Sequence, residues 1–179
     1  MSNGGAAITP VASVAALAAA TQGWYWDAAQ QLTLVKTASA ASARTIVLAG
    51  VDKAAYEAEF GVGTAVSTNI NHTGYTGVGF VDGFATVGAA VEVDVWAEAA
   101  ASHAIVLRYS NGSGSNATRT LYRNGTAVGT ITLPPTTNWD TWATASLPVA
   151  LTSGAQKIKV AFASGNTTGI NLDSIAISR

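Results

Sequence analysis

The stretch T-L-Y-R-N-G-T-A-V, residues 120–128, decides the fold class of this chain. An Asn-Gly pair between two strand-like runs is the strongest short signal for a β-hairpin, because both central residues of a type I′ turn need a positive φ. V-E-V-D-V-W, residues 91–96, alternates apolar and polar side chains, as a strand with one wet face does. These two stretches predict antiparallel β-structure.

Outward from this hairpin, the chain after Gly50 is a series of short strand-like runs separated by glycine-rich turns. H-A-I-V-L-R-Y begins at His103, K-I-K-V-A-F at Lys157 and N-L-D-S-I-A-I at Asn171. No long amphipathic pattern of helical period interrupts these runs. Short strands with frequent turns are typical of sandwiches and jelly rolls, so we expect an all-β fold, a jelly-roll β-sandwich.

The composition restricts the function further. Hydrophobic residues make up 49% of the 179 residues and charged residues 11%, and the formal net charge is -1. Proteins that bind nucleic acid present a basic stripe, and membrane-surface proteins a polybasic patch, so we expect neither kind of partner. The chain has no cysteine, which excludes disulfides, thiolate nucleophiles and cysteine-based metal sites.

The first 23 residues are rich in alanine, and we expect residues 1–23 to be a leader or linker. Ala18-Ala19-Ala20 resembles a signal-peptide cleavage site, but no Lys or Arg precedes Lys36. A short helix or linker is therefore the favoured interpretation, and a signal peptide is the alternative.

Two runs that follow the alanine-rich start are strand-like, namely W-Y-W-D-A-A-Q-Q-L-T-L-V-K-T from Trp24 and R-T-I-V-L-A-G from Arg44. They predict two antiparallel strands, which form a two-strand extension over residues 24–50. Two strands alone are marginally stable in water, so this extension should pack on another part of the protein. Residues 51–179 are expected to form the sandwich.

Catalytic constellations are missing from the sequence. Glu92 and Asp94 alternate with valines, which is typical of the wet face of a strand and not of a positioned acid–base pair. The chain contains no G-x-S-x-G, P-loop or dinucleotide-binding fingerprint. We therefore expect a protein that is not an enzyme and has no catalytic residues.

Six short motifs between Tyr56 and Ser178 occur in an order that resembles carbohydrate-binding module family 35 and, more distantly, family 6. They are Y-E-A-E at Tyr56, H-T-G-Y-T-G-V-G-F-V at His72, R-Y-S-N-G at Arg108, R-N-G at Arg123, W-D-T-W at Trp139 and N-L-D-S-I at Asn171. The resemblance implies a jelly-roll module, a structural calcium and a sugar site in the loops at one end. Residues 24–50 are similar to the closing strands of a glycoside hydrolase β-domain.

The first of these motifs carries a pair of carboxylates. Glu57 and Glu59 are two residues apart on an expected strand, so their side chains share a face, where like charges favour a cation or water. Taken alone, Glu57, Glu59 and Asp173 are more typical of ordinary solvated strand residues. The resemblance implies that Glu57, Glu59 and Asp173 hold a structural calcium, which prefers oxygen ligands.

Two tryptophans stand three residues apart in W-D-T-W, which places them on opposite faces of an extended segment. An indole face can stack on the apolar face of a sugar ring. The resemblance implies that Trp139 is this platform and that Trp142 is buried.

Three further residues complete the expected sugar site. Asn166 lies in the loop S-G-N-T-T-G, where an amide can both donate to and accept from hydroxyls, although Asn is also common in turns. The resemblance implies that Asn166 contacts the ligand and that an aromatic of the stretch G-Y-T-G-V-G-F forms a second wall. Of the two aromatics there, we expect Tyr75 to contact the ligand and Phe80 to lie in the core. Asn111 is a candidate by its position in a Gly/Ser/Asn loop.

Together these features predict a calcium-stabilised, non-catalytic module that binds a neutral polysaccharide or oligosaccharide. The resemblance implies a secreted, extracellular protein attached to a glycoside hydrolase catalytic domain. The alternative is a structural jelly-roll subunit that self-associates through the strands of residues 24–50 by strand addition.

Overall fold

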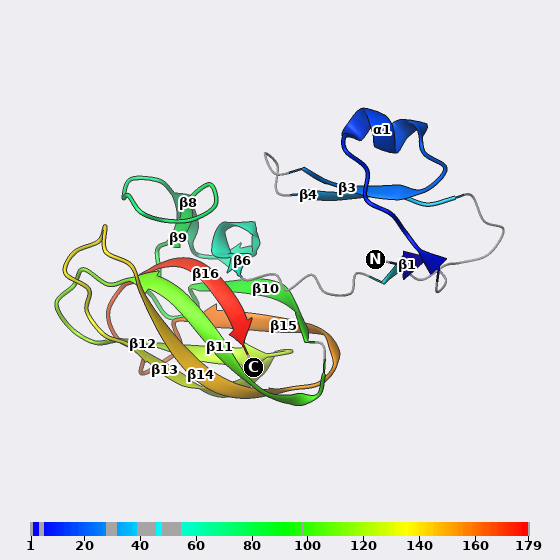
Figure 1. The fold of residues 1–179 in the computed structure, drawn as a ribbon. Coiled ribbons are helices and arrows are strands. Elements are labelled where there is room, and N and C mark those ends of the chain that lie inside the picture. Colours follow the sequence, from blue (N-terminus) through cyan, green and yellow to red (C-terminus); the bar gives the residue numbers. More distant parts are fainter. Residues whose placement is uncertain are drawn as a thin grey trace. The chain divides into compact units, whose positions relative to one another are not determined.

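A computed structural model describes residues 2–3, 6–27, 32–38, 46–47, 55–97 and 99–178. The chain divides into two compact units, Met1–Asp52 and Lys53–Arg179 (Figure 1). Within the described residues, no helix is both long and apolar enough to cross a membrane.

The unit Lys53–Arg179 is built from two antiparallel sheets (Figure 1). The five-stranded sheet has the order β13 (Thr126–Leu133), β12 (Ala117–Arg123), β15 (Gly154–Ala161), β10 (Ala90–Ala97) and β7 (Val62–Thr64). The other sheet has the order β14 (Ala143–Leu151), β11 (Ala101–Ser110), β16 (Asn171–Ser178), β9 (Phe80–Asp82) and β8 (Ser67–Asn69), and β6 (Tyr56–Glu57) also pairs with β16. A single 3-10 turn, η1 (Ala58–Phe60), follows β6. The predicted all-β sandwich is confirmed.

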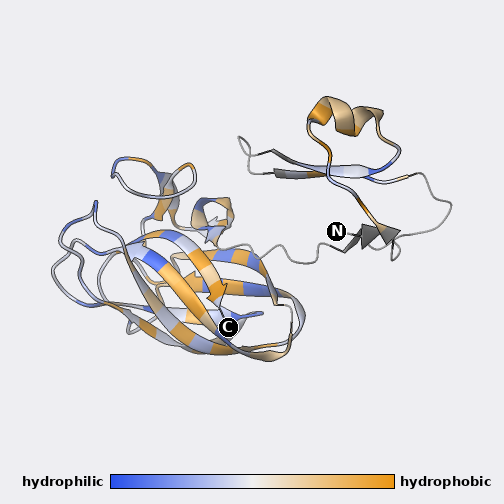
Figure 2. Cartoon of the chain, in the orientation of Figure 1, coloured by the Kyte–Doolittle hydropathy of each residue, from blue (hydrophilic) through white to orange (hydrophobic). Residues whose placement is uncertain are grey.

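The core lies between the two sheets and is supplied by alternate residues of their strands. Val91, Val93 and Val95 of β10 are buried, whereas Asp94 between them is exposed. Figure 2 shows the resulting alternation of hydrophobic and hydrophilic bands along the strands. Each fully buried aliphatic side chain contributes roughly 1.5–3 kcal/mol, so this pattern accounts for much of the stability of a unit without disulfides.

The predicted hairpin joins β12 to β13. Asn124 and Gly125 have φ values of 48° and 83°, and Arg123 pairs with Thr126 across the turn. Positive φ at both central positions is the type I′ requirement that made Asn-Gly informative.

The unit Met1–Asp52 contains a hairpin of β3 (Gly23–Asp27) and β4 (Leu32–Lys36). Residues Ser2–Asn3 (β1) pair with Ala6–Ala7 (β2) and with Ile46–Val47 (β5). The expected pairing of the run from Trp24 with the run from Arg44 is therefore wrong. The first run supplies both strands of a hairpin, in which Trp24 lies opposite Val35 and Trp26 opposite Thr33.

The expected short helix in the alanine-rich start is present as α1 (Val14–Ala19). The Ser13 side chain accepts a hydrogen bond from the Ala16 backbone N–H at 3.1 Å, which is the standard N-cap interaction. Leu17 is the buried residue of this helix.

Candidate functional site

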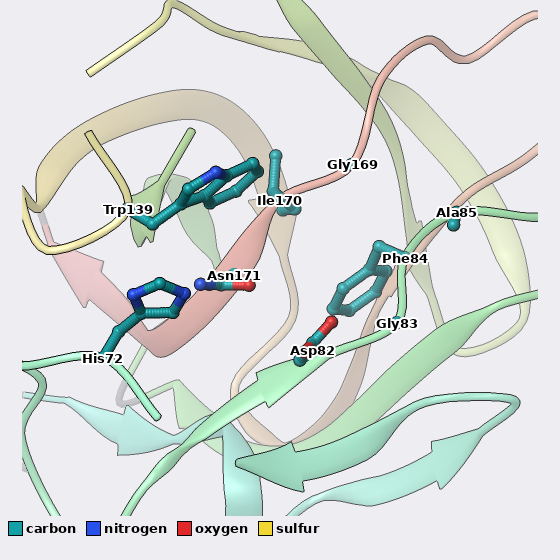
Figure 3. Close-up of a pocket in the computed structure, with 9 residues that line it drawn as sticks. All are labelled: His72, Asp82, Gly83, Phe84, Ala85, Trp139, Gly169, Ile170 and Asn171. Carbon is teal, nitrogen blue, oxygen red and sulfur yellow. The ribbon is translucent and has the colours of Figure 1, made fainter. Parts of the chain in front are cut away.

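A surface pocket of about 200 Å³ lies where four connecting segments of the sandwich meet (Figure 3). The segments are the β8–β9 loop, the end of β9 with the residues after it, the β13–β14 loop, and the chain that enters β16. Its lining residues are His72, Asp82, Gly83, Phe84, Ala85, Trp139, Gly169, Ile170 and Asn171. Pockets for drug-sized ligands measure roughly 300–1,000 Å³, so this pocket suits a ligand of about one sugar unit.

Trp139 forms one wall of the pocket and is only partly buried. Gly112 supports its indole from the other side: a Cβ placed on Gly112 would lie 2.7–2.8 Å from three ring atoms. The Trp139 carbonyl accepts a hydrogen bond from Ser110 Oγ at 2.8 Å, which fixes the backbone of this residue. One indole face is thus covered and the other borders the pocket, the arrangement needed for a stacking platform.

Trp142 does not line the pocket, and Trp139-Asp140 form a turn in place of the extended segment assumed for W-D-T-W. Its Nε1 donates to the Thr73 carbonyl at 2.8 Å, and its ring centroid lies 5.5 Å from that of Phe80. The guanidinium of Arg108 lies 5.2 Å from the Trp142 ring. Trp142 is partly buried and Phe80 fully buried, so both serve packing.

His72 stands beside Trp139 in the pocket and was not among the sequence-derived candidates. Its ring centroid is 6.3 Å from that of Trp139 and 5.9 Å from that of Phe80. Its Nδ1 lies 3.3 Å from Asp140 Oδ1. Hydrogen bonding from the Thr73 backbone N–H, assisted by His72, lowers the pKa of the Asp140 carboxyl.

Asn171 is another lining residue that was not predicted from the sequence. It is the first residue of β16 and is 5% exposed, yet it borders the pocket. Its position inside the apolar run I-N-L made it look like an ordinary strand residue. A buried amide in such a run needs hydrogen-bond partners. An asparagine between two apolar residues was therefore the sequence feature that could have pointed to this position.

The two asparagines predicted to contact the ligand instead form hydrogen bonds with backbone groups of the protein. Asn166 Oδ1 accepts from the backbone N–H groups of Ala163 (2.8 Å) and Thr120 (3.0 Å). Asn111 is fully buried, and its Nδ2 donates to the carbonyls of Ser115 (2.8 Å) and Leu133 (2.9 Å). Neither lines the pocket.

Tyr75 also lies outside the pocket lining. Its ring packs against Phe80 with a centroid distance of 5.7 Å. The structure therefore brings Trp139 together with His72 and Asn171, and not with Asn111, Asn166 or Tyr75.

The three predicted calcium ligands gather around the turn Thr76-Gly77, away from the pocket. Asp173 is fully buried; its Oδ1 accepts from the Thr76 N–H at 2.8 Å, and its Oδ2 faces the Thr76 hydroxyl at 2.8 Å. The same hydroxyl lies 2.9 Å from Glu57 Oε2. A hydroxyl has one proton to donate, so it cannot satisfy both carboxylates at once.

Glu59 lies close enough to Glu57 and Asp173 to be affected by their charges. Burial, with the charges of Glu57 and Asp173, raises its pKa although Val78 N–H donates to its Oε1 at 2.9 Å. Its Oε2 is buried without a hydrogen-bond partner among the described residues. A Cβ on Gly77, whose φ is +66°, would clash with Glu59 Oε1, so the turn closes directly over the carboxylates.

Other observations limit how a metal could be held there. Arg108 pairs with Asp173 Oδ2 at 2.5 Å, as expected for a strand arginine beside a carboxylate. Among the residues that the structure describes, no three His, Asp or Glu side chains form a metal-binding group. The cluster fits a cation only if backbone carbonyls or water supply most of its ligands, which calcium accepts.

Comparison with known proteins gives a consistent assignment. The family model described as carbohydrate binding module (family 35) matches residues 54–178. An isomaltosyltransferase of Sporosarcina globispora is 49% identical over 174 residues, which cover 97% of this chain and 16% of that protein. The chain therefore spans about a sixth of the length of this relative.

Solved structures agree with this result. A Listeria monocytogenes protein in complex with α-D-glucose, β-D-glucose, magnesium and calcium is 44% identical, with a TM-score of 0.69, and the match covers 99% of this chain and 17% of that chain. A family 35 carbohydrate binding module from Clostridium thermocellum is 28% identical, with a TM-score of 0.64, and the match covers 69% of this chain and 95% of that chain.

Proposed function

Because the chain belongs to carbohydrate-binding module family 35, we propose that its sandwich is a non-catalytic module that binds a neutral glycan in the pocket beside Trp139. The observation that carries this proposal is the arrangement of Trp139, with one indole face backed by Gly112 and the other open to the pocket. Asn171 adds an amide that can donate to one sugar hydroxyl and accept from another.

The charges around the pocket support a neutral ligand. Asp82 is the carboxylate among the lining residues, and the lining contains no Lys or Arg. An acidic sugar would bring a second negative charge next to Asp82 without a compensating cation, which is unfavourable. A hydroxyl-rich neutral sugar can instead donate hydrogen bonds to the carboxylate.

The relatives support a glucose-based glycan. The 49% identical relative is an isomaltosyltransferase, and a 44% identical protein was solved with glucose. We therefore propose that the ligand is an α-linked gluco-oligosaccharide or polysaccharide. We also propose that the module serves a glycan-active catalytic domain outside the cell.

A structural calcium at the carboxylate cluster is part of the proposal. Glu57, Glu59 and Asp173 would hold it with backbone carbonyls, and the ion would offset the charge repulsion that, together with burial, raises the pKa of Glu59. A related structure contains magnesium and calcium, and of these two ions calcium is the one that accepts irregular sets of carboxylate, carbonyl and water oxygens. The role of these residues is to join the first strand of the sandwich to its last.

Replacement of Trp139 tests the binding site. We expect isomalto-oligosaccharides to bind the wild-type chain and to bind Trp139→Ala at least about tenfold more weakly, because the stacking surface is lost. The matched control is Trp96→Ala, since Trp96 is an exposed tryptophan on β10 outside the pocket. Calorimetric titration with neutral and acidic oligosaccharides measures both variants.

Absence of binding to any glycan by folded wild-type protein would refute the proposal. Equal losses in the two tryptophan variants would refute the assignment of the site. The mass of the purified protein in solution, measured by light scattering, tests the alternative of a self-associating structural subunit.

A further inference from the structure

We propose that His72 contacts the glycan by accepting a hydrogen bond from a sugar hydroxyl at Nε2, and that Asp140 is the positioning residue that holds the imidazole for this contact. The inference rests on the proposed glycan-binding function and adds a specificity-determining group to it. Two observations support it: His72 lines the pocket, and its Nδ1 contacts Asp140, which does not line the pocket.

The imidazole lies in the pocket between the tryptophan platform and the buried amide. His72, Trp139 and Asn171 all line the pocket. In Figure 3 the His72 ring is directed towards the Asn171 side chain, with the indole of Trp139 above both. A sugar stacked on Trp139 would therefore present its hydroxyls to the imidazole and the amide.

Asp140 determines which ring nitrogen carries the proton. His72 Nδ1 lies 3.3 Å from Asp140 Oδ1, and an ionised carboxylate can only accept hydrogen bonds. The lowered pKa of Asp140 keeps it ionised. In the neutral imidazole, a proton on Nδ1 leaves Nε2 as an acceptor. Because His72 lines the pocket and Asp140 does not, Nε2 is the ring nitrogen left for a ligand.

The segment that carries His72 is held from both sides by the W-D-T-W motif. Asp140 Oδ1 also accepts from the Thr73 N–H at 2.8 Å, and Trp142 Nε1 donates to the Thr73 carbonyl at 2.8 Å. Asn138 Oδ1 accepts from the Asp140 N–H at 2.9 Å and so orients the aspartate in turn. The motif thus supplies the platform in Trp139 and fixes its partner His72 through Asp140 and Trp142.

The inference predicts a preference within neutral sugars. His72 Nε2 and the Asp82 carboxylate are both acceptors, so the ligand must present hydroxyl donors at two places. A deoxy sugar that lacks the hydroxyl facing His72 leaves this acceptor unpaired, which weakens binding.

Two substitutions of His72 separate its two nitrogens. The amide of His72→Gln reaches the position of Nε2, whereas the amide of His72→Asn reaches that of Nδ1. We expect His72→Gln to keep its affinity for isomalto-oligosaccharide within about twofold, and His72→Asn to bind three- to tenfold more weakly, the usual effect of one lost hydrogen bond. A purely structural role through Asp140 would give the opposite order.

The tautomer can be measured without any ligand. Nitrogen-15 chemical shifts of the His72 ring should show a proton on Nδ1 in the wild-type chain at neutral pH, and Asp140→Ala should shift the population towards a proton on Nε2. A wild-type imidazole protonated at Nε2 overturns the inference, as does unchanged glycan affinity in both His72 variants. Wild-type protein that binds no glycan refutes the proposed function, whereas wild-type binding with no effect of His72 refutes only the inference.

Discussion

Gly112 determines how closely the indole of Trp139 lies against the sandwich. Its φ is outside the left-handed region, so alanine at this position meets no backbone strain, but its Cβ would lie 2.7 Å from the ring. We expect Gly112→Ala to displace the indole and to weaken glycan binding on the order of tenfold, with little change in melting temperature. Calorimetric titration and thermal unfolding of the same samples check this.

Gly63→Ala, on β7 and outside the pocket lining, is the matched control for that experiment. A Cβ on Gly63 would lie 2.9 Å from the Val66 side chain, and the φ of Gly63 is also outside the left-handed region. Its affinity should equal that of the wild type. Equal effects of the two alanines would contradict the supporting role of Gly112.

The three asparagines show how far residue-level reasoning can go. Asn111, Asn166 and Asn171 all lie next to turns or strand ends, and the amide chemistry of all three suits a sugar. Asn111 and Asn166 instead bond to neighbouring backbone, whereas Asn171 reaches the pocket. Sequence cannot separate them because an amide that closes a turn and an amide that binds a ligand obey the same local preferences.

At the level of elements, one buried arginine of β12 joins the loops around the pocket. The Arg119 guanidinium is fully buried, and it donates to the carbonyls of Phe84 (2.9 Å), Thr167 (3.0 Å) and Thr168 (2.7 Å). Burial lowers its pKa to about 10, so it remains charged at neutral pH. The guanidinium carbon of Arg119 lies 5.4 Å from the ring centroid of Phe84 and 4.8 Å from that of Phe162.

Arg119→Met should therefore destabilise the sandwich by at least about 3 kcal/mol, because several buried carbonyls lose their donor. Arg123→Met is the control on the same strand, where the guanidinium donates to Ala150 O in a partly exposed position. Its cost should be below about 1 kcal/mol. Urea unfolding of both variants measures the difference, and equal costs would contradict the role given to Arg119.

At the level of the whole molecule, the proposed calcium is a prediction about stability. A ligand that binds only the folded state at 100 times its Kd adds about 2.7 kcal/mol, which raises the melting temperature of a domain of this size on the order of 10 °C. We expect chelator to remove this increment from the wild type and to leave Glu59→Gln unchanged. Thermal unfolding with calcium and with chelator measures it; identical curves for the wild type would exclude a structural calcium.

The sequence by itself determined the sandwich, the β12–β13 hairpin and the family, because strand period, turn chemistry and motif order are local properties of the chain. It also distinguished the two tryptophans, of which Trp139 lines the pocket and Trp142 does not. The strand pattern gave a wrong prediction between Trp24 and Lys36, where one strand was expected and the structure has two paired strands. Only the tertiary structure decided the composition of the pocket, since His72, Trp139 and Asn171 come from segments up to 99 residues apart. Their convergence depends on how loops end on a packed core, and that is a long-range property which no short stretch of sequence encodes.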